Sequence, residues 1–350
     1  MLTNLLFENN LWLKAITCFL SSLIIAKISL KKYIDYVHQK QLFQPIRLDG
    51  PQSHLETKKK TPTMGGIFII LSTLITTLLF INIFNRYIII CLVVMITFAS
   101  IGLVDDILKV VYKNPKGFKG SYKIIIQFLV IGLSLLWLGI IDKIHLDNRI
   151  YIPIIDGYYL TLWSILYVLF VNFVIVGTSN AVNLTDGLDG LVSIPAIINL
   201  ICLIILIYFI STPKLAQSFN ITEIKFTGEL IFLSISLIGS ISGFLIYNLK
   251  PAKVFMGDVG SLAIGSVLGL IAIIIKQEII FFIISLLFVA ESLSVILQVG
   301  SYKLRKKKIF LMAPIHHHFE KMGWSETKVV RAFWSASGFF AILGLYIFLI

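Results

Sequence analysis

The chain has 350 residues, of which 57% are hydrophobic and only 14% are charged. A soluble domain usually has about a quarter charged residues, so this composition excludes an ordinary soluble enzyme and indicates a protein embedded in lipid. The net charge of +12 is also compatible with nucleic acid binding. Basic residues that flank apolar segments, however, more often set membrane orientation or contact anionic head groups. We therefore expect a membrane protein with no nucleic acid partner.

Ten apolar runs are long enough to cross a hydrocarbon core about 30 Å thick, which takes roughly 20 residues of helix. Backbone polar groups in lipid must be satisfied within their own segment, and runs without two-residue alternation are typical of helices rather than barrel strands. The sequence therefore predicts an all-α, polytopic integral membrane protein that forms a single domain over residues 1–350. The predicted spans are Leu11–Leu30, Gly66–Phe84, Tyr87–Val104, Ile124–Ile141, Tyr158–Thr178, Gly190–Ile210, Gly228–Tyr247, Gly260–Ile275, Ile279–Gln298 and Val329–Ile350.

Basic residues gather on one side of these runs. The connections after the odd-numbered runs, together with Arg331 at the start of the tenth run, hold 22 of the 30 Lys and Arg residues. This distribution predicts that these connections face the cytoplasm and that both termini are periplasmic. Glu8 precedes the first run and no small-residue cleavage site follows it, so we expect an uncleaved span rather than a signal peptide. The three cysteines lie in apolar runs without metal-ligand spacing, which indicates neither a disulfide framework nor a zinc site.

Five aspartates stand at cytoplasmic ends of the predicted spans: Asp105, Asp106, Asp186, Asp189 and Asp258. A carboxylate beside lipid is costly and tends to be kept for an ion, a proton or a substrate. Each could instead cap a helix or pair with a loop lysine, as Lys109 could pair with the first two. The adjacent Asp105 and Asp106 suit a metal, a general base or one of each, because two like charges repel unless a cation separates them.

Two glycine-containing segments extend this pattern. Asp258 follows Phe255-Met256-Gly257 near a predicted helix N-terminus, where free N–H groups favour phosphate and a carboxylate can hold magnesium. Asn183, Asp186 and Asp189 recur every three residues, which predicts one face of a helical turn beside a polar substrate. A calcium loop is the alternative, but the Glu that ends an EF-hand pattern is absent from this segment.

Two long cytoplasmic connections carry basic and histidine residues. Lys58–Lys60 precede Thr61–Gly66, and Lys303–Lys308 precede His316–His318. Hydroxyls, glycines and cations suit phosphates, although orientation and lipid attraction account for most of these lysines. The histidine run adds donors or metal ligands. Glu291, Ser294 and Gln298 share a helical face, for which interhelical hydrogen bonding is the default interpretation.

The strings VDD, NAVNLTDGLDGL, NLKPAKVFMGDVGSL and MAPIHHHFEKMGW resemble the bacterial phospho-N-acetylmuramoyl-pentapeptide transferase family, within the polyprenyl-phosphate N-acetylhexosamine-1-phosphate transferase superfamily. The resemblance runs from about Lys58 to Trp334, and TPTMGG and HHHFE are typical of the muramoyl-pentapeptide branch. One departure is Lys60, which stands where the family usually has a glycine.

The resemblance implies that UDP-N-acetylmuramoyl-pentapeptide and undecaprenyl phosphate react with magnesium at the cytoplasmic face of the bacterial inner membrane. The products would be UMP and the first lipid intermediate of peptidoglycan. Motif by motif, it implies a metal ligand at Asp258 and catalytic residues at Asp105, Asp106, Asp258 and His316. It implies substrate contacts at Lys58, Thr63, Lys123, Asn180, Asn183, Asp186, Asp189, Asn248, Phe255, His317 and His318.

Several alternatives stay open at this point. A sister transferase would use UDP-N-acetylglucosamine, and an ion-coupled transporter would also keep carboxylates, although at mid-membrane on broken helices. A structural scaffold gives no reason for aspartates on one side. The transfer can proceed by direct attack or through an aspartyl-phosphate. A homodimer is one partner that the sequence neither requires nor excludes.

Overall fold

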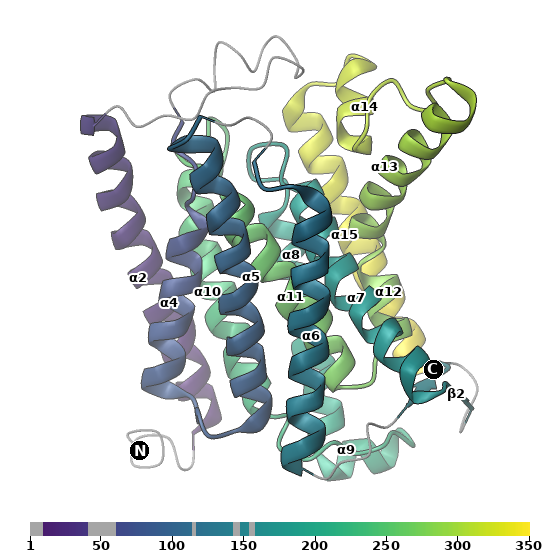
Figure 1. Cartoon of the computed structure of the whole chain (residues 1–350). Helices are drawn as coiled ribbons and strands as arrows, with labels where there is room; N and C mark the ends of the chain where they lie inside the picture. Colours follow the sequence, from purple (N-terminus) through teal and green to yellow (C-terminus); the bar gives the residue numbers. More distant parts are fainter. Residues whose placement is uncertain (1–9, 41–60, 114–116, 143–147, 154–157) are drawn as a thin grey trace. The chain divides into compact units, whose positions relative to one another are not determined.

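The computed structural model describes residues 10–40, 61–113, 117–142, 148–153 and 158–350. In this part of the chain, helices predominate and one two-stranded antiparallel sheet is present. In chain order (Figure 1) the elements are α2 (Leu11–Lys40), α4 (Gly66–Phe80), α5 (Arg86–Val110), α6 (Gly120–Asp142), β1 (Arg149–Tyr151), β2 (Tyr159–Thr161), α7 (Ser164–Thr185), α8 (Ser193–Ser211), α9 (Pro213–Ser218), α10 (Glu229–Asn248), α11 (Asp258–Ile274), α12 (Glu278–Ile284), α13 (Leu286–Arg305), α14 (Ile315–Lys321) and α15 (Glu326–Leu349).

Among the described residues, seven helices are long and apolar enough to cross a membrane, namely α2, α5, α7, α8, α10, α13 and α15. Three shorter apolar helices lie in α4, α6 and α11. Each of these ten elements overlaps one of the ten apolar runs. The prediction of a helical, polytopic membrane protein is therefore confirmed.

Two predicted spans differ from the structure in their details. The fifth run was expected to be helical from Tyr158, but Tyr159–Thr161 pair with Arg149–Tyr151 as a short hairpin, and α7 begins at Ser164. Aromatic and β-branched residues suit such a hairpin, and their apolar character extended the run. The ninth run was expected to be one helix, but it divides at Ser285 into α12 and α13.

The chain divides into two compact units, which are described separately. The first unit comprises residues 1–134 and 229–264, and the second comprises residues 135–228 and 265–350. The division falls within α6 and α11. A single functional domain over residues 1–350 stays a prediction.

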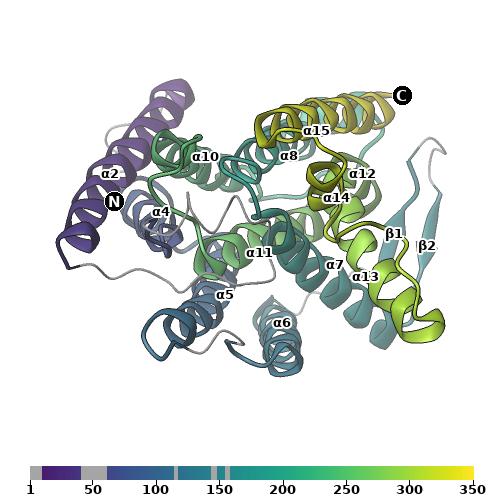
Figure 2. The ribbon, with the colours of Figure 1, turned by 90° about the horizontal axis from the view of Figure 1, so that it is seen from above.

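In the first unit, α2, α4 and α10 pack against one another, and α4 and α10 also contact α5. Figures 1 and 2 show α2, α4 and α10 side by side. Small residues allow this close approach, since a Cβ added at Gly243 would lie 2.6 Å from the Leu23 carbonyl oxygen. The Thr73 and Ser240 hydroxyls join α4 to α10 at 2.8 Å. Close backbone packing and hydroxyl pairs thus hold these helices together.

In the second unit, α15 packs against α8, α12, α13 and α14, and α7 packs against α13. Figure 2 shows α14 beside α13 and α15. A buried apolar cluster joins the segment after α7 to α13 and α15, and its members are Leu188, Leu191, Leu287, Val329, Val330 and Phe333. The leucines of the DGLDGL string therefore anchor that segment in the core, while its polar residues lie between them.

Candidate functional site

Three aspartates come together in the first unit. Asp105 and Asp106 lie near the end of α5, and Asp258 is the first residue of α11. One carboxylate oxygen from each lies within 4.8 Å of the other two. Asp105 is 1% exposed and Asp106 is 3% exposed. Three carboxylates at this separation, two of them buried, repel one another strongly unless cations lie between them. The group can therefore bind a metal ion.

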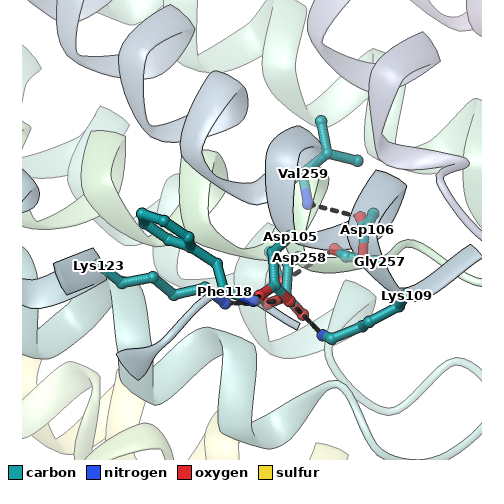
Figure 3. A network of polar contacts seen from close by, with 9 residues as sticks. Asp105, Asp106, Lys109, Phe118, Lys123, Gly257, Asp258 and Val259 are labelled. Atoms are coloured by element: carbon teal, nitrogen blue, oxygen red, sulfur yellow. Dashed lines mark hydrogen bonds and ion pairs between the residues drawn. The ribbon is translucent and has the colours of Figure 1, made fainter. Parts of the chain in front are cut away.

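Two lysines face the same carboxylates (Figure 3). The Lys123 Nζ, from the first turn of α6, lies 2.6 Å from Asp258 Oδ2 and 3.1 Å from Asp105 Oδ2. The Lys109 Nζ forms an ion pair with Asp105 and lies 3.4 Å from Asp258 Oδ1. Two ammonium groups against three carboxylates leave a deficit of positive charge. A divalent cation would compete with the lysines for the same oxygens.

Main-chain N–H groups complete the contacts. Phe118 N donates to Asp105 Oδ1 at 2.6 Å, and Val259 N donates to Asp106 Oδ2 at 3.1 Å. The second bond uses one of the N–H groups that every helix leaves free in its first turn, so Asp106 caps α11 from a different helix. The capping alternative considered for these aspartates therefore applies to Asp106, and it holds the two aspartate motifs together.

Gly257 has φ +76°, and an added Cβ would lie 2.5 Å from Asp106 Oδ2 and 3.1 Å from Thr63 Oγ1. Both the backbone conformation and the space require glycine at this position. The Thr63 hydroxyl and the Asp106 carboxylate therefore lie on the same side of Gly257. Of the predicted substrate contacts, Thr63 and Lys123 thus lie next to the carboxylates.

Glycines also fix the first turn of α11. A Cβ added at Gly102 of α5 would overlap the Asp258 carbonyl, and one added at Gly66 of α4 would overlap Gly260. The adjoining loops pair through the main chain, with Gly65 N donating to Phe255 O at 2.9 Å and Gly66 N donating to Met256 O at 2.8 Å. Direct backbone packing against α4 and α5 therefore sets the position of Asp258.

The other predicted residues of this unit support the loops. Asn248 is buried, and its side-chain Nδ2 donates to Val254 O at 2.9 Å, which holds the connection that leads to Asp258. Phe255 N donates to Pro62 O at 2.8 Å. Lys58 and Lys60 lie outside the described residues.

The second unit holds the remaining candidates in α7, in the turn after it and in α14. His316 lies on α14 with its Nδ1 2.9 Å from Glu291 Oε1, and an added Cβ at Gly187 would overlap His316 Nε2. The ring therefore lies directly against the turn that carries Asp186 and Asp189. His317 Nδ1 is 2.6 Å from Glu320 Oε2, and His318 Nδ1 accepts a hydrogen bond from Leu311 N at 3.1 Å.

The helical-face prediction for Asn183, Asp186 and Asp189 is wrong, because α7 ends at Thr185. Asn183 lies in the last helical turn, while Asp186 and Asp189 belong to the following turn. The helix ends through Asp186, whose backbone (φ −77°, ψ 56°) is no longer helical, and Gly190 with φ +74° lies later in the same turn segment. Asn180 Nδ2 donates to the Val176 carbonyl one turn earlier, at 2.8 Å.

Comparison with known proteins identifies the family. The model of Glycosyl transferase family 4 matches residues 88–276, and that of Phospho-N-acetylmuramoyl-pentapeptide-transferase signature 1 matches residues 58–70. A phospho-N-acetylmuramoyl-pentapeptide-transferase of Psychrobacter arcticus is 42% identical over 348 residues, which is 96% of this chain and 93% of that protein. The chain belongs to the phospho-N-acetylmuramoyl-pentapeptide-transferase family.

Other members of the transferase family are similar over most of their length. The protein from Rickettsia canadensis is 48% identical over 305 residues, covering 86% of this chain and 83% of the relative. The one from Francisella tularensis subsp. tularensis is 43% identical over 343 residues, covering 97% and 93%. This membership decides against both the ion-coupled transporter and the sister transferase that uses UDP-N-acetylglucosamine.

Three residues near these groups in the transferase were not predicted as site residues. Lys109 was considered only as an ion-pair partner, although its position four residues after Asp105 places both on one helical face. Glu326 Oε1 accepts the Asp189 N–H at 3.2 Å, and Trp334 Nε1 donates to Gly190 O at 3.3 Å. No local sequence signal links Glu326 or Trp334 to a turn more than 130 positions earlier. The convergence of the aspartate cluster with the histidine group stays a prediction.

Proposed function

We propose that the cluster of Asp105, Asp106 and Asp258 holds a magnesium ion and is the centre at which this transferase brings two phosphates together. The reaction follows from the family. The chain transfers phospho-N-acetylmuramoyl-pentapeptide from its UDP-linked donor to undecaprenyl phosphate, releasing UMP and forming the first lipid intermediate of peptidoglycan. The observation that supports the proposed centre is the approach of three carboxylates from two helices to within 4.8 Å.

The residues present fit magnesium. Carboxylate oxygens are the ligands that this cation prefers in proteins, and it is commonly bound by one or two carboxylates together with substrate phosphates. Asp258 is the proposed ligand from the protein, since its side chain is 15% exposed, compared with 1% for Asp105. When bound, magnesium offsets the negative charge of the diphosphate and of the departing UMP.

The chain's own residues supply the remaining functions. Asp105 accepts the proton of the lipid phosphate, whose oxygen attacks the sugar-bound phosphorus of the donor; the bond between the two donor phosphates breaks and UMP leaves. Lys109 and Lys123, which already contact Asp105 and Asp258, stabilise charge on the phosphates. A two-step route through an aspartyl-phosphate uses the same residues. A phospho-enzyme trapped without the lipid acceptor would favour that route.

The polar residues of the second unit are proposed to contact the donor. Its nucleotide and sugar offer hydrogen-bonding groups that suit amide, carboxylate and imidazole side chains. The proposed contacts are Asn180, Asn183, Asp186, Asp189, His316, His317 and His318, together with Lys58, Thr63, Asn248 and Phe255 of the first unit.

The centre is proposed to face the cytoplasm of a bacterial inner membrane, in a protein that spans it ten times with periplasmic termini. Asp105 and Asp106 lie at the end of α5 that leads to a lysine-containing connection, and Asp258 follows the connection with Lys250 and Lys253. Connections rich in Lys and Arg stay in the cytoplasm. The nucleotide donor is water-soluble, whereas the acceptor's phosphate lies at the membrane surface.

Asp258→Asn tests the metal role. We expect this substitution to abolish magnesium-dependent UMP release by purified, detergent-solubilised protein, because a neutral amide is a poor ligand for a hard cation. Asp35→Asn, at an exposed position of α2, is the matched control and should retain normal turnover. Near-normal turnover of the Asp258 variant would remove this residue from the metal site.

A further inference from the structure

A buried carboxylate in the second unit is paired with a histidine of the proposed site. Glu291 of α13 and His316 of α14 have side chains that are 0% and 1% exposed, and Glu291 Oε1 lies 2.9 Å from His316 Nδ1. Since a carboxylate only accepts hydrogen bonds, this contact assigns the Nδ1 proton to the bond with Glu291. The other ring nitrogen, Nε2, then keeps its lone pair and can accept a hydrogen bond.

We propose that Glu291 is a positioning residue for the transfer reaction, which fixes the tautomer and the ring orientation of His316 so that Nε2 points at the turn carrying Asp186 and Asp189. The proposal rests on the proposed function, in which His316 contacts the donor. The bond joins α13 to α14, so the default interpretation of Glu291 as an interhelical hydrogen-bond partner is confirmed, and the proposal adds a function to that bond.

The orientation of the ring supports this role. An added Cβ at Gly187 would overlap Nε2 and would lie 2.8 Å from His316 Cε1, so this edge of the imidazole lies against the turn. An imidazole that rotated by half a turn would exchange its two edges, and the bond to Glu291 opposes that rotation. The absence of a Cβ at Gly187 leaves the polar edge of the ring in direct contact with the backbone.

The pair also has hydrogen-bonding atoms that the described residues leave unused. Glu291 Oε2 and His316 Nε2 are both buried, and neither has a hydrogen-bond partner among the described residues. Buried polar atoms are normally paired, and an ionisable side chain in a membrane segment is costly. Apolar side chains of similar volume often replace a buried polar pair without loss of stability, so helix packing alone does not require this one. The unpaired Nε2 therefore points to a partner that arrives with the substrate.

A double-mutant cycle tests the proposal on the full-length, detergent-solubilised transferase, with UMP release as the readout. Glu291→Gln should lower kcat by about 10- to 100-fold, with the KM for the UDP-linked donor changed by less than about 3-fold. Glu291→Asp keeps the carboxylate and should recover part of the loss. In a His316→Ala background, Glu291→Gln should change kcat by less than about 2-fold, because residues that act as a unit are not additive.

A matched control separates positioning from a general effect of burial. Glu278 of α12 is 4% exposed and lies in the same unit, and Glu278→Gln should leave turnover unchanged. Normal turnover of Glu291→Gln would overturn the proposal. An equal loss from Glu291→Gln with and without His316 would also overturn it, since Glu291 would then act independently of the ring. Unchanged turnover of His316→Ala would also overturn the positioning role of Glu291. The magnesium proposal would not be affected by that result, because Asp258→Asn tests it separately.

Discussion

Replacement of Gly102 by alanine should separate the two aspartate motifs of the first unit. Gly102 lies one helical turn before Asp105 and Asp106 on α5, and its Cα faces the main chain of Asp258 at the start of α11. One added methyl group would therefore act directly on the spacing of the carboxylates, although it removes no functional group.

The size of the effect follows from the distances. The new Cβ would lie 2.5 Å from Val259 N, whereas ordinary van der Waals contact begins at 3.4 Å, and backbone atoms cannot rotate away. The first turn of α11 must therefore move by about 1 Å, and a misplacement of that size can lower a rate by roughly 100-fold. Overpacking costs about 1–3 kcal/mol of stability, partly offset by about 1 kcal/mol from the higher helix propensity of alanine.

The assay compares two variants, Gly102→Ala and Gly132→Ala. UMP release and the thermal unfolding temperature are measured for each. A Cβ at Gly132 of α6 would meet nothing within 4 Å, so this control should retain normal turnover. We expect the Gly102 variant to lose roughly 100-fold in kcat. Turnover within about 3-fold of the unaltered protein, with an unchanged melting temperature, would refute the idea that backbone contact sets the carboxylate spacing.

Two further predictions concern the neighbours of the proposed groups. Gly187→Ala should displace the His316 ring, which an added Cβ would overlap, and should lower kcat by about 10-fold or more. Gly177→Ala, with nothing within 4 Å, is its control, and equal turnover of the two variants would contradict the contact. Lys123→Met should lower the Mn²⁺ concentration needed for half-saturation of substrate-free protein, because an ammonium 2.6 Å from Asp258 no longer competes. Unchanged or weaker Mn²⁺ binding in a calorimetric titration would show that Lys123 and the metal do not share the carboxylate.

The sequence predicted the helices well because every span must satisfy its backbone polar groups within lipid and must be long enough to cross it. The length of an apolar run is sufficient to indicate such a span. It did not predict the division of the ninth run at Ser285, since residues 278–298 contain neither proline nor glycine to signal a break. The end of α7 at Thr185 could have been predicted, because Gly187 follows closely and glycine commonly terminates a helix.

The grouping of Asp105 and Asp106 with Asp258 was also predictable in outline, because all three stand at helix ends on the side of the basic connections. The partners within the group were not. Val259 N and Phe118 N bind through the main chain, which any residue supplies and which sequence patterns do not reveal. The glycines of TPTMGG were considered only as suited to phosphate, and the sequence did not reveal that Gly66 packs against the backbone of Gly260.

The backbone contacts of α4 and α5 with the first turn of α11 bear on which positions of this protein can vary in evolution. The approach of α4 and α5 to the first turn of α11 involves atoms common to every amino acid, apart from the glycines that permit it. Apolar side chains elsewhere on these helices can therefore be exchanged for others of similar bulk without altering the geometry of the charged centre. The chain and its Psychrobacter arcticus relative differ at more than half of their aligned positions. The helices around the charged centre can therefore diverge in sequence while the spacing of its carboxylates stays the same.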